Sequence, residues 1–154
     1  MKRFLILLVA CLVYCTNCGG DDGGPIPGRP SGSSPSIFDL QCPETSLNRN
    51  QGGGGYTVEG CSLDFIDEDE DMATILQMSL YTAQDCGQAP LADIPIDVRS
   101  QTVGQKEGTV VFNARIKTNC VAGTYTYGFV AVDEESNESD TLTLDFVLVE
   151  AVVP

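Results

Sequence analysis

The residues of this sequence that are best suited to chemistry are carboxylates, and they are concentrated in two short stretches. Six of the eight residues from 64 to 71 (DFIDEDED) are acidic, and a second acidic stretch runs from 133 to 140 (DEESNESD). Carboxylate oxygens are the hard ligands that Ca²⁺ prefers, and the ion takes about six to eight of them. The candidate ligands for Ca²⁺ are Asp67, Asp69, Asp71 and Asp133.

Two simpler interpretations of the acidic stretches remain open. Acidic loops at strand ends are usually just solvated, and an aspartate in a turn often only caps that turn. The spacing is also not that of an EF-hand loop, because a loop starting at Asp67 has no Gly at its sixth position and no Glu at its twelfth. A Ca²⁺ site would therefore be shared between two loops and weak.

Composition argues against an enzyme and against a nucleic-acid partner. The chain has no His for acid–base chemistry, no G-x-S-x-G motif, and a glycine run at 52–55 that lacks the Lys of a phosphate-binding loop. The net charge of −14 repels phosphate backbones. We therefore predict a non-enzymatic protein that requires no cofactor, with Ca²⁺ as the one possible ligand ion.

The seven cysteines fall into two groups. Four lie in the body of the chain, at Cys42, Cys61, Cys86 and Cys120, and an even number in an exported protein implies two disulfides, with three pairings open. The other three precede residue 19. Cys15 and Cys18 form a C-x-x-C pair, but a zinc site needs further Cys or His ligands nearby, and a redox site needs a βαβ context. Neither is present in the flanking sequence.

The first residues predict export. Lys2 and Arg3 precede an uncharged apolar run of eleven residues, 4–14 (FLILLVACLVY). That run is shorter than the roughly 20 residues of a membrane-spanning helix and fits the apolar core of a secretory signal.

This leader resembles the signal of bacterial lipoproteins, which is cleaved before a cysteine that receives the lipid. Cys18, followed by GGDDGG, has the better position; Cys11, in Leu-Val-Ala-Cys, is the alternative, and Cys15 follows the bulky Tyr14. The resemblance implies a membrane anchor through an N-terminal lipid and a place in the bacterial cell envelope, on the outer membrane facing the periplasm or the cell surface. It divides the chain into a signal peptide (1–17), a lipidated Cys with a disordered Gly/Pro/Ser-rich linker (18–36) and one domain (37–154).

The domain has the period-two hydrophobicity of β-strands throughout. Seven strands are predicted. The strand at 94–99 carries Pro95 and is expected at a sheet edge, and Gly60 is expected to form a bulge. A helix is the alternative for residues 71–83. The predicted strands cover residues 37–42, 56–66, 74–81, 94–99, 109–116, 124–132 and 141–149. Seven strands without long helices predict an all-β fold, a seven-stranded antiparallel β-sandwich.

The sandwich resembles immunoglobulin-like and fibronectin type III-like modules. Gly123-Thr-Tyr125-Thr-Tyr127 resembles their Gly-x-Tyr entry into the sixth strand, and Val130-Ala-Val-Asp133 with Ser136-Asn-Glu-Ser139 resembles their last turn. The resemblance implies that Tyr125 is a tyrosine corner, whose hydroxyl bonds the backbone a few residues upstream. Its topology also implies the disulfides Cys86–Cys120 and Cys42–Cys61, and brings the two acidic stretches together at the opposite end. It implies no antibody-type core, since the chain has no Trp and has Tyr127 where a Cys would stand.

The sequence thus predicts a non-enzymatic, lipid-anchored envelope protein whose immunoglobulin-like module has a binding or structural role. Its partner would be a protein or an envelope glycan. The alternative is a Ca²⁺-dependent adhesion or interaction module that uses the acidic loops.

Overall fold

The computed structural model describes residues 32–151. The predicted signal peptide, the leader cysteines Cys11, Cys15 and Cys18, and most of the predicted linker lie outside these residues. Within the described part, no helix has the length and apolar character needed to cross a membrane.

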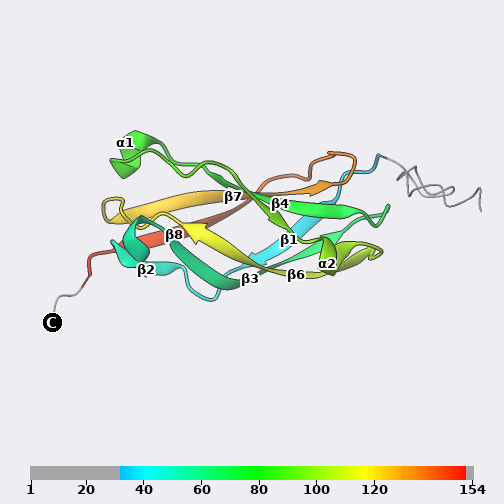
Figure 1. Cartoon of the computed structure of the whole chain (residues 1–154), viewed down its shortest axis with the longest axis horizontal. Helices are drawn as coiled ribbons and strands as arrows, with labels where there is room; N and C mark the ends of the chain where they lie inside the picture. Colours follow the sequence, from blue (N-terminus) through cyan, green and yellow to red (C-terminus); the bar gives the residue numbers. More distant parts are fainter. Residues whose placement is uncertain (1–31, 152–154) are drawn as a thin grey trace, which may run out of the picture.

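The described residues form two β-sheets that face each other (Figure 1). The smaller sheet has the order β1-β3-β6, with strands β1 (Ser36–Gln41), β3 (Tyr56–Ile66) and β6 (Glu107–Ile116). The larger sheet has the order β2-β8-β7-β4-β5, with strands β2 (Ser46–Asn48), β8 (Leu142–Val149), β7 (Gly123–Asp133), β4 (Met72–Ser79) and β5 (Ile94–Asp97). Three short helical turns lie in the connections: η1 (Gln51–Gly54), α1 (Ala83–Cys86) and α2 (Arg99–Thr102).

Alternating side chains of the two sheets make the core between them. In β6 the even-numbered residues from Val110 to Ile116 are buried and the odd-numbered ones are exposed, as expected for a strand with one face on the core. The rings of Phe112 and Phe129 bring the two sheets into contact, with centroids 5.6 Å apart. β7 is buried on both faces from Tyr127 to Ala131, and it lies at the centre of the larger sheet.

Each of the seven predicted strand ranges overlaps an observed strand, and residues 72–79 form a strand, not the rival helix. The register between β3 and β6 shifts between Val58 and Cys61, and Gly60 there has φ 74°, a left-handed conformation that favours glycine. Pro95 lies in β5, an edge strand, where its missing N–H costs no sheet hydrogen bond.

The expectation of a seven-stranded, wholly antiparallel sandwich is wrong in one respect. Among the described residues there is an eighth strand, β2, and it pairs parallel with β8. β2 has only three residues, of which only Leu47 is buried, so it shows no repeated alternation along the sequence. Its position depends on β8, about a hundred residues further along the chain.

The two ends of the sandwich are built differently. At one end, α1 holds Cys86, which is bonded to Cys120, and the hydroxyl of Tyr125 donates to the carbonyl of Val121 at 2.8 Å. A second disulfide, Cys42–Cys61, joins the end of β1 to β3. We call the end that contains α1 and Cys86–Cys120 the cystine end. The opposite end holds the turn between β3 and β4 and the turn between β7 and β8, and we call it the acidic end (Figure 1).

Candidate metal centre

In the turn between β3 and β4, buried acidic residues alternate with more exposed ones. Asp67, Asp69 and Asp71 are buried, with exposed fractions of 1%, 1% and 5%, while Glu68 is exposed and Glu70 is half-buried. The turn thus continues the in–out alternation of the strand before it. Lys106 forms an ion pair with Glu68 on the outside, with Nζ and Oε2 3.2 Å apart.

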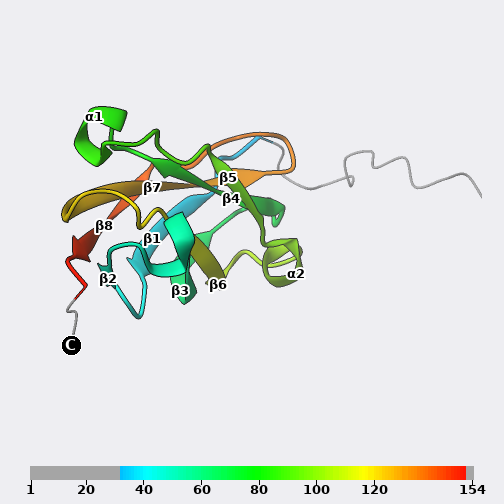
Figure 2. The ribbon, with the colours of Figure 1, turned by 60° about the vertical axis from the view of Figure 1, so that its left-hand side comes forward.

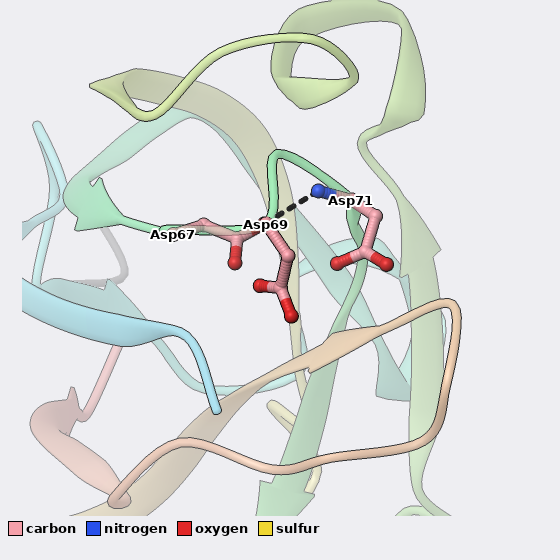
Figure 3. Close-up of side chains that lie close together, drawn as sticks. All are labelled: Asp67, Asp69 and Asp71. Atoms are coloured by element: carbon pink, nitrogen blue, oxygen red, sulfur yellow. Dashed lines mark hydrogen bonds between the residues drawn. The ribbon is translucent and has the colours of Figure 1, made fainter. Parts of the chain in front are cut away.

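The three buried aspartates meet in one cluster. Each offers one carboxylate oxygen, and these three atoms all lie within 4.8 Å of one another. Figure 3 shows the three carboxyl groups on the same side of the turn. Oxygens at that spacing are close enough to bind one cation, since Ca²⁺–oxygen distances are about 2.3–2.6 Å.

Asp67 organises the turn through one of its carboxylate oxygens. Its Oδ2 accepts the backbone N–H groups of Asp71 and Met72, both at 2.6 Å (the former is drawn in Figure 3). Glu70 adopts φ 63° and donates its N–H to the carbonyl of Asp67 at 3.3 Å, which closes the turn. The other carboxylate oxygen of Asp67, Oδ1, is fully buried and has no hydrogen-bond donor among the described residues.

Burial and the closeness of the carboxyl groups shift the pKa values of Asp67 and Asp69 in opposite directions. Burial, together with a hydrogen bond to the Asp69 side chain, raises the pKa of Asp67 from 3.8 to about 6. Burial also acts to raise the pKa of Asp69, but hydrogen bonds from Asp67 and Ser33 outweigh it, so this pKa is lowered. Two carboxyl groups in hydrogen-bonding contact require a proton between them, and a cation at the same place would take over that function.

Ser33 joins the site from the segment that precedes β1. Its hydroxyl donates to Oδ1 of Asp69 at 2.9 Å and its backbone N–H donates to Oδ2 at 3.2 Å. Pro35, two residues further along, is buried. Sequence reasoning missed Ser33 because it lies in a stretch whose Gly/Pro/Ser composition predicts a linker, and no pattern marks a contact across 36 residues.

Two other loops support the cluster through the backbone. The N–H of Glu134, in the β7–β8 turn, donates to the carbonyl of Asp71 at 3.1 Å. The N–H of Gly104, between α2 and β6, donates to the carbonyl of Glu70 at 2.9 Å. The two acidic stretches therefore do meet at one end of the sandwich, as the topology predicts.

Asp133 comes to this end of the molecule but does not join the cluster. Its two carboxylate oxygens accept the backbone N–H and the side-chain amide of Asn137, both at 2.7 Å. Ser136 takes φ 70° in the same turn, a left-handed conformation that non-glycine residues seldom adopt. Asp133 thus serves as the cap of its own turn, the simpler interpretation of this residue, and the cluster among the described residues consists of Asp67, Asp69 and Asp71.

Comparison with known proteins gives a structural likeness alone. No known family model and no curated protein match the sequence significantly. Eight solved chains match in structure. One is the crystal structure of a Niemann-Pick type C2 protein from Japanese carpenter ant, with a TM-score of 0.44 and 8% identity over 76% of this chain and 94% of that chain. At these values nothing about a ligand or partner is transferred to this chain.

The identification as a bacterial lipoprotein with an immunoglobulin-like or fibronectin type III-like domain is wrong. One of the solved structures that match is a Niemann-Pick type C2 protein, and lipoprotein status has no support in the comparisons. The physical reason is that the motifs behind the identification are local. A tyrosine that bonds Val121 and an aspartate that caps a turn stabilise many sandwiches, and they do not distinguish between families.

Proposed function

We propose that this protein is a non-enzymatic binding module whose acidic end binds one Ca²⁺ ion at Asp67, Asp69 and Asp71. The observation that supports the proposal is the convergence of three buried carboxyl groups, each with one oxygen within 4.8 Å of the others. Ionising buried carboxyl groups side by side costs free energy when no positive charge lies among them. A bound cation would remove that cost.

The chemistry of the cluster favours Ca²⁺ over other common metals. Its side-chain ligands are hard oxygens, without the Cys or His that zinc and copper prefer. Ca²⁺ tolerates irregular coordination completed by backbone carbonyls and water, whereas Mg²⁺ demands a near-ideal octahedron. Three carboxylates on one turn, without a bidentate glutamate, correspond to the weak sites of extracellular modules, with dissociation constants of about 10⁻⁴–10⁻³ M.

The disulfides agree with such a site. Cys42–Cys61 and Cys86–Cys120 indicate an oxidising compartment outside the cytosol, where free Ca²⁺ is abundant enough to fill a weak site. The same compartment is where a protein or glycan partner would be met. That partner, and the absence of enzymatic activity, stay predictions.

The test is calcium titration of the full chain, followed by calorimetry and thermal unfolding. At a free Ca²⁺ concentration a hundred times the dissociation constant, binding to the folded state adds about 2.7 kcal/mol and raises Tm by roughly 10 °C. Asp69→Asn should weaken Ca²⁺ binding at least tenfold, while the matched control Glu68→Gln, on the outer side of the same turn, should bind Ca²⁺ like the unchanged protein.

Asp69→Asn removes a charge but keeps the shape of the side chain, so its folding can be checked by circular dichroism without calcium. A protein that unfolds at the same temperature with Ca²⁺ and with a chelator would refute the proposal. Equal loss of binding in the two variants would show general charge attraction in place of a site.

A further inference from the structure

The outer edge of β6 is closed by two glutamine side chains. β6 is an edge strand of the smaller sheet and pairs on one side with β3. In an antiparallel pair, the N–H and C=O of alternate residues point away from the partner strand. On an edge strand these groups are free to pair with a strand of another molecule.

Gln101 covers this edge near its middle. Its side-chain amide donates from Nε2 to the carbonyl of Val111 at 2.9 Å, and its Oε1 accepts the N–H of the same residue at 2.9 Å. Gln101 lies on α2, which immediately precedes β6 and sits beside the beginning of that strand (Figure 2). The side chain is exposed, so this cover is formed on the surface of the molecule.

Gln77 does the same four residues further along. It is a buried residue of β4 in the opposite sheet, with 2% exposed. Its Nε2 donates to the carbonyl of Arg115 at 2.6 Å and its Oε1 accepts the N–H of Arg115 at 2.9 Å. A primary amide has an acceptor oxygen and two N–H donors, one of which lies on the same side as the oxygen. Each glutamine can therefore bond both the N–H and the C=O of one β6 residue, as a residue of a neighbouring strand would.

We propose that Gln77 and Gln101 keep β6 closed to strand pairing, and that the partner they exclude is a second copy of this chain. Two independent residues, one from α2 and one from β4 of the opposite sheet, make the same pair of hydrogen bonds to the same edge. Because these backbone N–H and C=O groups already have partners, they are not available to pair with a strand of another molecule.

The charges of β6 identify the excluded partner. If two β6 strands pair antiparallel with Val111 opposite Val111, then Thr109 faces Asn113 and Glu107 faces Arg115 at both ends. Opposite charges across a strand pair stabilise it. Val111 is 52% exposed and would be covered by its symmetry mate. Without the glutamines, β6 is thus complementary to itself.

Hydrogen exchange tests the caps one by one in the full chain. Gln101→Ala should speed exchange of the Val111 amide by at least tenfold and leave the Arg115 amide unchanged, and Gln77→Met should do the reverse. The matched control Gln105→Ala, an exposed glutamine of the same loop, should alter neither amide. Exchange at Val111 that is as slow in Gln101→Ala as in the unchanged protein would overturn the proposal.

Light scattering tests the excluded partner. The unchanged protein should stay monomeric, whereas Gln101→Ala combined with Gln77→Met should dimerise as concentration rises. Adding Arg115→Glu should abolish that dimer by placing like charges opposite each other, and adding Glu107→Arg as well should restore it. If the double variant does not fold, the same charge series is made in Gln101→Ala alone. A folded variant that stays monomeric throughout would overturn the assignment of the partner.

Discussion

At both ends of the sandwich, loops from distant parts of the chain are held together, but the interactions that hold them differ. At the cystine end a covalent bond joins Cys86 to Cys120, and the nearby tyrosine hydroxyls have hydrogen-bond partners within the protein. At the acidic end three carboxyl groups are buried together and one oxygen of Asp67 has no donor among the described residues. The cystine end needs no group from solution, whereas the acidic end holds a proton between carboxyl groups and, in our proposal, exchanges it for a cation.

The tyrosines show how complete the cystine end is. The Tyr81 ring meets Tyr125 and Tyr127 edge-on, with centroids 5.1 and 5.4 Å apart. The Tyr127 hydroxyl, deep in the core, bonds the hydroxyl of Tyr81 at 3.1 Å and accepts the N–H of Lys117 at 2.9 Å. Burial and the bond to Tyr81 raise the pKa of Tyr127, so it stays neutral. The stability of this end should therefore not respond to calcium.

The largest effect on stability is expected from removing the Cys86–Cys120 disulfide, which also tests whether the two ends are independent. Replacing Cys86 and Cys120 together by Ala should lower the free energy of unfolding by about 3–4 kcal/mol, because the disulfide closes a long loop. The stabilisation by Ca²⁺ should persist, since the acidic end is untouched. Urea unfolding with and without Ca²⁺ measures both quantities. If the disulfide-free protein also lost its calcium response, the two ends would not be independent.

Tyr127→Phe should have the next largest effect. The change leaves the Lys117 N–H and the Tyr81 hydroxyl without a partner inside the protein, which costs about 1–3 kcal/mol. Tyr81→Phe, which removes the other hydroxyl of the pair, is the matched comparison and should cost less, because Tyr127 keeps the bond from Lys117. If chemical denaturation gave the same decrease in the free energy of unfolding for both variants, the Tyr81–Tyr127 hydrogen bond alone would account for the effect.

The pH dependence of stability should reveal the acidic end. The folded pKa of Asp67, about 6, lies above the ordinary value of 3.8, so the folded state holds its proton more tightly than the unfolded state. In chelator, stability should therefore fall by about 1–2 kcal/mol as pH rises from 4 through 6. Saturating Ca²⁺ should reverse this trend, because the cation replaces the proton. Thermal unfolding across this pH range is the measurement, and a flat profile in chelator would contradict it.

The smallest effect tests the link between the acidic end and the segment before β1. Ser33→Ala removes the hydroxyl bond to Asp69 but keeps the backbone one, and should cost about 0.5–1 kcal/mol in chelator. Ser34→Ala, an exposed neighbour, should cost nothing measurable by denaturant unfolding. A loss shared by both variants would point to the segment as a whole in place of the Asp69 contact.

Sequence patterns were most informative where the determinant is local. Alternation marks every long strand, Gly60 marks the bulge in β3, and Pro95 marks an edge, because each reflects the conformational preference of a few adjacent residues. β2 was missed for the converse reason: three residues carry no period, and only pairing with β8 makes them a strand. The family identification failed because turn and corner motifs are equally local.

For the candidate site, the sequence by itself determined which residues could bind a cation, since six acids in eight residues leave few other candidates. Only the tertiary structure decided which of them turn inward. It buried Asp67, Asp69 and Asp71, left Glu68 in solvent, assigned Asp133 to its own turn, and added Ser33 from a segment with no pattern. The physical reason is that ligand type is a property of one residue, whereas burial and distance depend on how remote strands pack against one another.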